Sequence, residues 1–274
     1  VGYVGEVFGW HYGFSLAGFG MLLGQISFLI GKKNITEVSK KNSSKNTFSF
    51  KMKKQLSSIE LDRVKLILIS SLILVIFWAS FEQAGGLLNI FAYEKTNRYL
   101  SFLNSEIPAS WFQSINPLLI IVLGYSVSVF WMYLKKRGML ATSIFKISIG
   151  IIIMGLGFIF MIFASIESEI YGKSSMYWLF LAYLFFTIGE LCASPVILSY
   201  ITKLSPEKLT ASIMGIYFAT IGLGNKLAGV IGQYSQALGE KLIFTGITLL
   251  CVFVGGLVIM LHKRLIKLSH GVDD

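Results

Sequence analysis

Charged residues, proline, cysteine and histidine are all scarce in this 274-residue chain. Only 14% of the residues are charged, whereas about a quarter are charged in a soluble domain. Hydrophobic residues make up 54%, and the mean hydropathy is +0.70. These values exclude a soluble globular domain. The apolar residues form long continuous runs, which excludes the alternating strands of a membrane barrel. The sequence therefore predicts a polytopic helical protein embedded in a lipid bilayer.

The few cysteines and histidines form no metal-binding pattern. Cys192 and Cys251 each lie in an apolar run and are expected to be inert packing residues. His11, His262 and His270 lie near the ends of runs or in the tail, without ligand spacing. The sequence also has no phosphate-binding loop and no G-x-S-x-G elbow. We therefore expect no metal, no cofactor, no catalytic residue and no enzymatic activity.

Seven apolar runs are long enough to cross a bilayer as helices. They cover residues 13–30, 66–93, 108–134, 144–165, 177–202, 212–233 and 242–261. The predicted fold class is all-α. The domain boundaries that follow are 1–31 for one helix with the end of a preceding loop, 32–65 for a flexible or surface-lying basic linker, 66–265 for a six-helix bundle and 266–274 for a tail. Because the chain opens on Val1 and not on methionine, we expect it to be a fragment.

The basic residues set the predicted orientation of these helices. The net charge is +10, and ten of the 24 Lys and Arg lie between Lys32 and Lys65, in a linker and not on a nucleic-acid-binding face. Assigning Lys and Arg to alternate sides of the seven runs places 19 on the side of the linker and tail and 5 on the other. By the positive-inside rule the linker and the C terminus are expected to be cytoplasmic. No nucleic-acid partner is expected.

Glu82 is a carboxylate inside an apolar run, and its position there requires an explanation. The run from Leu66 to Tyr93 is expected to form one helix, and Glu82 lies roughly 24 Å along it. A charge at this depth is costly unless it is paired, hydrated or neutralised, so it marks a candidate functional site. On a continuous helix its sector also holds Ser71, Trp78, Gly85 and Asn89. One interpretation is a protonatable carboxylate; the other is a structural one, packed against helix backbone or a lysine.

Glu190 is the second intramembrane carboxylate, on a helix face shared with Tyr183, Thr187 and Ser194. It could attract an ammonium group, or it could be structural. Pro195 is expected to kink or loosen the same helix.

Asn116 and Pro117 allow two interpretations. They could begin a helix, with Asn as its N-cap, or they could mark a break in a longer helix from Pro108, where the amide lines a cavity. Trp78 and Phe81 could likewise line a cavity or face neighbouring helices. Lys226 is expected to reach the membrane interface.

Four stretches of the chain together resemble one known family, the proton-dependent oligopeptide transporters of the major facilitator superfamily. They are Phe77 to Gly85 (FWASFEQAG) with Asn89 to Ala92, Pro108 to Pro117 (PASWFQSINP), Gly189 to Pro195 (GELCASP), and Met214 to Phe218 (MGIYF) followed by Gly224 to Gly229 (GNKLAG). Their order and spacing match too. With the start Gly9 to Phe14, the resemblance covers nearly the whole chain.

This resemblance implies a fold of two six-helix bundles, of which the chain would supply the sixth to the twelfth helix. It implies that Glu82 forms a gating salt bridge with a Lys of the N-terminal bundle, and that proton and peptide binding alter this bridge. Asn116 and Glu190 match positions that bind the peptide amino terminus, and Trp78 matches a cavity-wall aromatic. Tyr217 stands where Trp is expected, so side-chain selectivity is expected to differ. The E-x-x-E-R motif of the first helix is absent from this chain.

The function expected from the sequence is therefore proton-coupled import of di- and tripeptides, as a symporter of the bacterial inner membrane with a cytoplasmic C terminus. The expected partners are peptides, protons, the lipid bilayer and the N-terminal bundle of the same transporter. Two alternatives remain open: a major facilitator for another small solute, and a non-transporting membrane interaction module.

Overall fold

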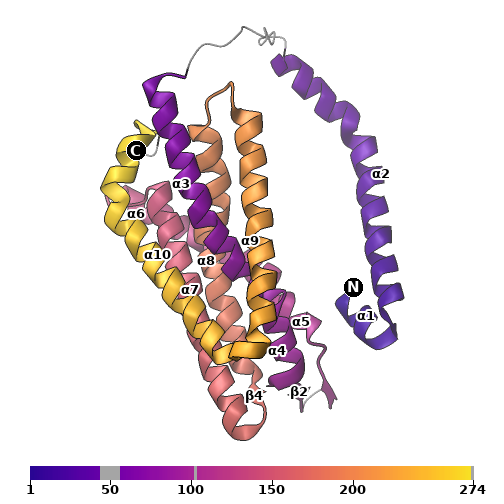
Figure 1. Cartoon of the computed structure of the whole chain (residues 1–274). Helices are drawn as coiled ribbons and strands as arrows, with labels where there is room; N and C mark the ends of the chain where they lie inside the picture. Colours follow the sequence, from indigo (N-terminus) through magenta and orange to yellow (C-terminus); the bar gives the residue numbers. More distant parts are fainter. Residues whose placement is uncertain (44–55, 102–103, 273–274) are drawn as a thin grey trace. The chain divides into compact units, whose positions relative to one another are not determined.

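The structure, a computed structural model, describes residues 1–43, 56–101 and 104–272 (Figure 1). The chain divides into two compact units, Val1–Gln55 and Leu56–Asp274. Each unit is described by itself. The middle of the predicted linker, residues 44–55, lies outside the described residues.

The first unit consists of two helices, α1 (Gly2–Phe8) and α2 (Trp10–Ser43). Gly9 separates them with a φ of 111°, a backbone conformation that suits glycine. The sequence-based expectation of a loop before Trp10 is wrong, because residues 2–8 are helical. The expected helix end at Lys32 is also wrong. The sequence has no Pro or Gly between Lys32 and Ser43 that would end α2 earlier.

The second unit contains the remaining helices of the described chain. They are α3 (Ser58–Phe81), the 3₁₀ turn η1 (Glu82–Ala84), α4 (Leu87–Lys95), α5 (Ser110–Gln113), α6 (Ile115–Lys136), α7 (Ser143–Tyr171), α8 (Met176–Leu204), α9 (Thr210–Leu238) and α10 (Glu240–Ser269). Four short strands lie in the connections: β1 (Thr96–Asn97), β2 (Tyr99–Leu100), β3 (Ser105–Glu106) and β4 (Ser174–Ser175). β1 pairs with β4 in parallel, and β2 with β3 antiparallel.

Seven segments of the described residues are long and apolar enough to cross a membrane, one in the first unit and six in the second. The predicted all-α class is confirmed. Polar residues outside the apolar runs extend several helices beyond the predicted ends. Ser57 begins α3 through a capping box with Glu60, and Thr142 and Ser175 cap α7 and α8.

The core of the second unit lies where α7 packs on α8 and α10, and where α3 packs on α9. Glycines allow the closest approaches. A Cβ on Gly155 would lie 2.5 Å from the Cβ of Cys251 on α10, and a Cβ on Gly224 would lie 2.6 Å from that of Trp78 on α3. Around these contacts is a continuous cluster of buried apolar side chains. Small residues therefore let the helix backbones of the bundle pack closely, as is usual for helices in lipid.

Polar contacts join the start of α3 to the end of α10. The Asp62 carboxylate lies 3.1 Å from His270 Nε2, and Arg63 Nε donates to the Ser269 carbonyl over 3.3 Å. The start of α3 and the end of α10 thus share one end of the bundle, while α4 and α5 lie at the other (Figure 1). The linker and the tail therefore leave the bundle at the same end.

Candidate functional site

Glu82 lies where the helix from Ser58 breaks. α3 ends at Phe81, the turn η1 follows, and α4 starts again at Leu87. The expectation of one continuous helix from Leu66 to Tyr93 is therefore wrong. The break occurs at two consecutive glycines, and the backbone N–H groups of Gly85 and Gly86 both donate to the Glu82 carbonyl over 3.2 Å. Glu82 itself is partly buried.

Two side-chain hydrogen bonds hold the broken segment. Gln83 is 1% exposed, and its Nε2 donates to the carbonyls of Ala79, over 3.0 Å, and of Ala228 on α9, over 3.2 Å. From the other side, the Tyr183 hydroxyl on α8 donates to the Ala84 carbonyl over 2.9 Å. The position of the Glu82 backbone is therefore defined by α8 and α9 together.

Asn116 and Glu190 come together across α6 and α8. Asn116 Nδ2 donates to Glu190 Oε2 over 2.8 Å and to Thr187 Oγ1 over 3.2 Å. Of the two interpretations of Asn116, neither holds in full. α6 starts at Ile115 after the short helix α5, and Ser114, not Asn116, is its cap residue. The amide of Asn116 is thus free to cross to α8.

The two predicted carboxylates lie on different elements, Glu82 in the turn η1 and Glu190 in α8. Within the described residues Glu82 has no ion pair, and there is no group of three His, Cys, Asp or Glu that could hold a metal ion. The site is therefore acidic, with carboxylates and amides but no internal cation beside Glu82.

The two predicted aromatic site residues differ in exposure. Trp78 is partly buried, with its ring edge-on to those of Phe77 and Phe81, and its buried Nε1 has no hydrogen-bond partner in the described chain. Tyr217 on α9 is 7% exposed and belongs to the apolar core cluster. A role in binding stays a prediction for both.

A pocket of about 540 Å³ opens beside Glu82, between the broken helix and α9. It is lined by Glu82, Gly85, Gly86, Leu87, Ile90, Asn225, Ala228, Gly229, Gly232, Gln233 and Gln236. Sequence reasoning missed the amides Asn225, Gln233 and Gln236. Together with Gly229 and Gly232 they recur at helical spacing, which places them on one face of α9. This pattern could have predicted a polar face there. Asn116 and Glu190 do not line this pocket.

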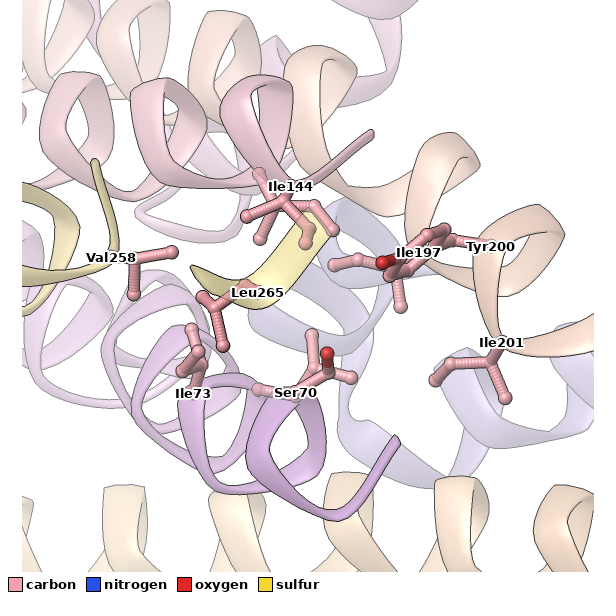
Figure 2. Close-up of a pocket in the computed structure, with 10 residues that line it drawn as sticks. Ser70, Ile73, Ile144, Ile197, Tyr200, Ile201, Val258 and Leu265 are labelled. Atoms are coloured by element: carbon pink, nitrogen blue, oxygen red, sulfur yellow. The ribbon is translucent and has the colours of Figure 1, made fainter. Parts of the chain in front are cut away.

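A second cavity, among α3, α7, α8 and α10, is unsuited to a polar solute (Figure 2). Its walls are almost entirely aliphatic, with Ser70 and Tyr200 as the polar exceptions. It offers about 10 Å³ to a water-sized sphere, which is about the least that one water molecule needs. The Glu82 pocket and the Asn116–Glu190 pair remain the candidate site.

Comparison with known proteins gives the same family as the motifs. The profile described as POT family matches residues 35–242. The chain is 38% identical over 181 residues to the peptide transporter YePEPT of Yersinia enterocolitica, covering 64% of this chain and 35% of that protein. It is 34% identical over 201 residues to the uncharacterized transporter YclF of Bacillus subtilis, covering 72% of this chain and 39% of that protein. The chain thus spans well under half of these relatives.

Solved structures share the fold. A crystal structure of peptide transporter POT in complex with sulfate matches with a TM-score of 0.80 and 24% identity, covering 97% of this chain and 64% of that one. A POT family transporter in complex with thioalcohol conjugated peptide matches with a TM-score of 0.69 and 24% identity, covering 91% of this chain and 54% of that one. The predicted bundle of a major facilitator fold with one preceding helix is confirmed. On the profile match and this architecture together, the chain belongs to the POT family.

Proposed function

We propose that this chain is the C-terminal part of a proton-coupled symporter that imports di- and tripeptides. The observation that carries the proposal is the pair Asn116 and Glu190, 2.8 Å apart on two different helices. A carboxylate held beside an amide offers charge and hydrogen-bond acceptors to an ammonium group, which every free peptide carries at its amino terminus. The relatives named as peptide transporters support the same substrate class.

Glu82 is proposed as the proton-coupling and gating group. It has no ion-pair partner in the described chain, and it lies at a break where the backbone can move without unwinding a long helix. By family resemblance its partner is a Lys of an N-terminal bundle. Protonation of Glu82 would neutralise its side of this bridge and release the gate, which couples the proton gradient to the conformational change.

Alternating access needs a second bundle that rocks against this one. We infer that the N-terminal bundle of the same transporter supplies it, and that the substrate path lies between the two. Trp78 and Tyr217 are proposed as aromatic residues of the peptide cavity. The basic linker and tail favour a bacterial inner-membrane protein with a cytoplasmic C terminus.

Uptake into proteoliposomes tests this function. The full-length protein that carries this chain is reconstituted, and entry of a labelled dipeptide is measured with and without an inward proton gradient. We expect gradient-dependent accumulation that unlabelled di- and tripeptides suppress, while N-acetylated dipeptides, which lack the ammonium group, compete poorly. Accumulation of a sugar, nitrate or a drug without competition by dipeptides would assign the other major facilitator function. Absence of any uptake would favour the interaction module.

A further inference from the structure

Tyr183 contacts the broken helix from the same face of α8 that carries Glu190. We propose that Tyr183 is a positioning residue, which holds the Glu82 turn in place through the Ala84 carbonyl and links that turn to the Asn116–Glu190 pair. The inference rests on the proposed function for its effect on transport. Its structural content, a hydrogen bond that restrains the break, stands on the geometry alone.

The hydrogen bond has a clear physical reason on each side. Tyr183 is 1% exposed, and a buried phenol hydroxyl needs a partner. The Ala84 carbonyl lies where the i to i+4 ladder of the helix is interrupted, between η1 and α4. A carbonyl freed in this way in an apolar surrounding must be satisfied by a side chain. The Tyr183 hydroxyl reaches it over 2.9 Å.

The same helix face leads from this bond to the Asn116–Glu190 pair. Tyr183, Thr187 and Glu190 follow each other at spacings that place them on one side of α8. The Thr187 hydroxyl donates to the Tyr183 carbonyl over 2.7 Å and accepts from Asn116. A shift of α8 that alters the Asn116–Glu190 contact therefore also pulls on the Ala84 carbonyl.

Loss of the Tyr183 hydroxyl is not expected to unfold the bundle. Gln83, the residue before Ala84, still donates from its side chain to the Ala228 carbonyl on α9. One restraint on the turn therefore remains. The α7–α8 interface, which carries the main packing, is untouched. Removal of the hydroxyl should therefore loosen the turn between Glu82 and Leu87 and leave the rest of the fold as it is.

The test compares Tyr183→Phe with Tyr177→Phe in the full-length protein. Both changes remove one hydroxyl from α8, but Tyr177 is 59% exposed. Backbone hydrogen exchange over residues 82–90 is measured first, since it needs no transport. We expect exchange in Tyr183→Phe to be about three- to tenfold faster than in the wild type, the range that corresponds to one hydrogen bond. In Tyr177→Phe we expect the exchange rate to be unchanged. Unchanged exchange in Tyr183→Phe overturns the inference.

Transport provides the second readout. We expect Tyr183→Phe to lower proton-driven dipeptide accumulation while counterflow of dipeptide without a gradient is retained. In a Glu82→Gln background it should have no further effect, because the group that it positions has been removed. Equal loss in both assays with a lower melting temperature would show a merely structural role and overturn the inference. No counterflow in the wild-type protein would overturn the proposed function but leave the exchange result valid.

Discussion

Gly150 and Gly189 face each other across α7 and α8 so closely that a Cβ on either would lie 2.6 Å from the carbonyl oxygen of the other. No Cβ fits at that distance without a shift of the backbone. Because Gly189 precedes Glu190, this contact fixes the depth and rotation of the part of α8 that carries the site. The packing of two helices thus sets the position of a functional carboxylate.

Gly189→Ala is predicted to destabilise the bundle. The added methyl group would lie 2.6 Å from the Gly150 carbonyl oxygen and 3.0 Å from the Met154 Cβ, so α7 and α8 must separate. Overpacking of this kind costs about 1–3 kcal/mol. Thermal unfolding in detergent should show a clearly lower melting temperature. The control is Gly215→Ala on α9, where nothing lies within 4 Å of the added methyl group. Equal melting temperatures for the two variants would contradict the prediction.

Glu190→Gln is predicted to weaken peptide binding without loss of fold. Glutamine keeps the size of the side chain and an oxygen for Asn116, but it removes the charge that an ammonium group would need. Hydrogen bonds to charged groups contribute roughly 1.5–3 kcal/mol, so the Kd for a dipeptide should rise roughly ten- to a hundredfold.

Calorimetric titration of the purified full-length protein measures this Kd. An N-acetylated dipeptide serves as the ligand control, because its binding does not use an ammonium group and should be unaffected. An unaltered Kd for the free dipeptide in Glu190→Gln would count against the ammonium role of this carboxylate.

Asn116→Ala is predicted to weaken peptide binding by a different route. The change removes the donor to both Glu190 and Thr187 but leaves the charge of Glu190 in place. Glu190 then loses a partner that fixes its direction, so the Kd should rise by less than in Glu190→Gln. Gln113→Ala, an exposed amide at the end of α5, is the matched control and should bind as the wild type does. A Kd unchanged in both variants would show that the amide is dispensable.

The apolar pattern predicted where the helices are, because each run must cover the thickness of a bilayer. It could not place their ends, which depend on local polar residues. Ser57 and Glu60, for example, start α3 before the apolar run at Leu66 through two hydrogen bonds of a capping box. α2 continues to Ser43 through polar residues that carry no apolar period.

The candidate site was predictable on α8 and only partly on α3. The spacing of Tyr183, Thr187 and Glu190 alone placed them on one face, and the structure uses that face for contacts to the turn η1 and to α6. The break after Phe81 was not predicted, because two glycines are tolerated in membrane helices when neighbours satisfy the freed backbone. Whether Gly85 and Gly86 break the helix depends on partners distant in the sequence, such as Tyr183 and Ala228.

Lys95→Met is predicted to lower stability slightly. Lys95 Nζ lies 2.9 Å from Glu240 Oε2, and the Glu240 side chain is only 11% exposed, so the pair joins the end of α4 to the start of α10. Partial screening by solvent limits the effect to about 1 kcal/mol or less. The matched control is Lys241→Met, because the Lys241–Glu169 pair is longer, at 3.5 Å, and both its side chains are about half exposed. Melting temperatures should fall for Lys95→Met and stay unchanged for Lys241→Met; the reverse order would contradict the assignment.

Glu82→Gln is predicted to abolish proton-driven uptake in the full-length protein while dipeptide counterflow persists. Glutamine has nearly the same shape as glutamate, but it cannot take up or release a proton. The backbone of the turn is fixed by Gln83 and Tyr183 and not by the carboxylate, so the fold and the Asn116–Glu190 pair should survive. The control is Glu94→Gln, an exposed carboxylate at the end of α4. Accumulation of dipeptide against its gradient by Glu82→Gln, at the level of Glu94→Gln, would show that the proton is carried elsewhere.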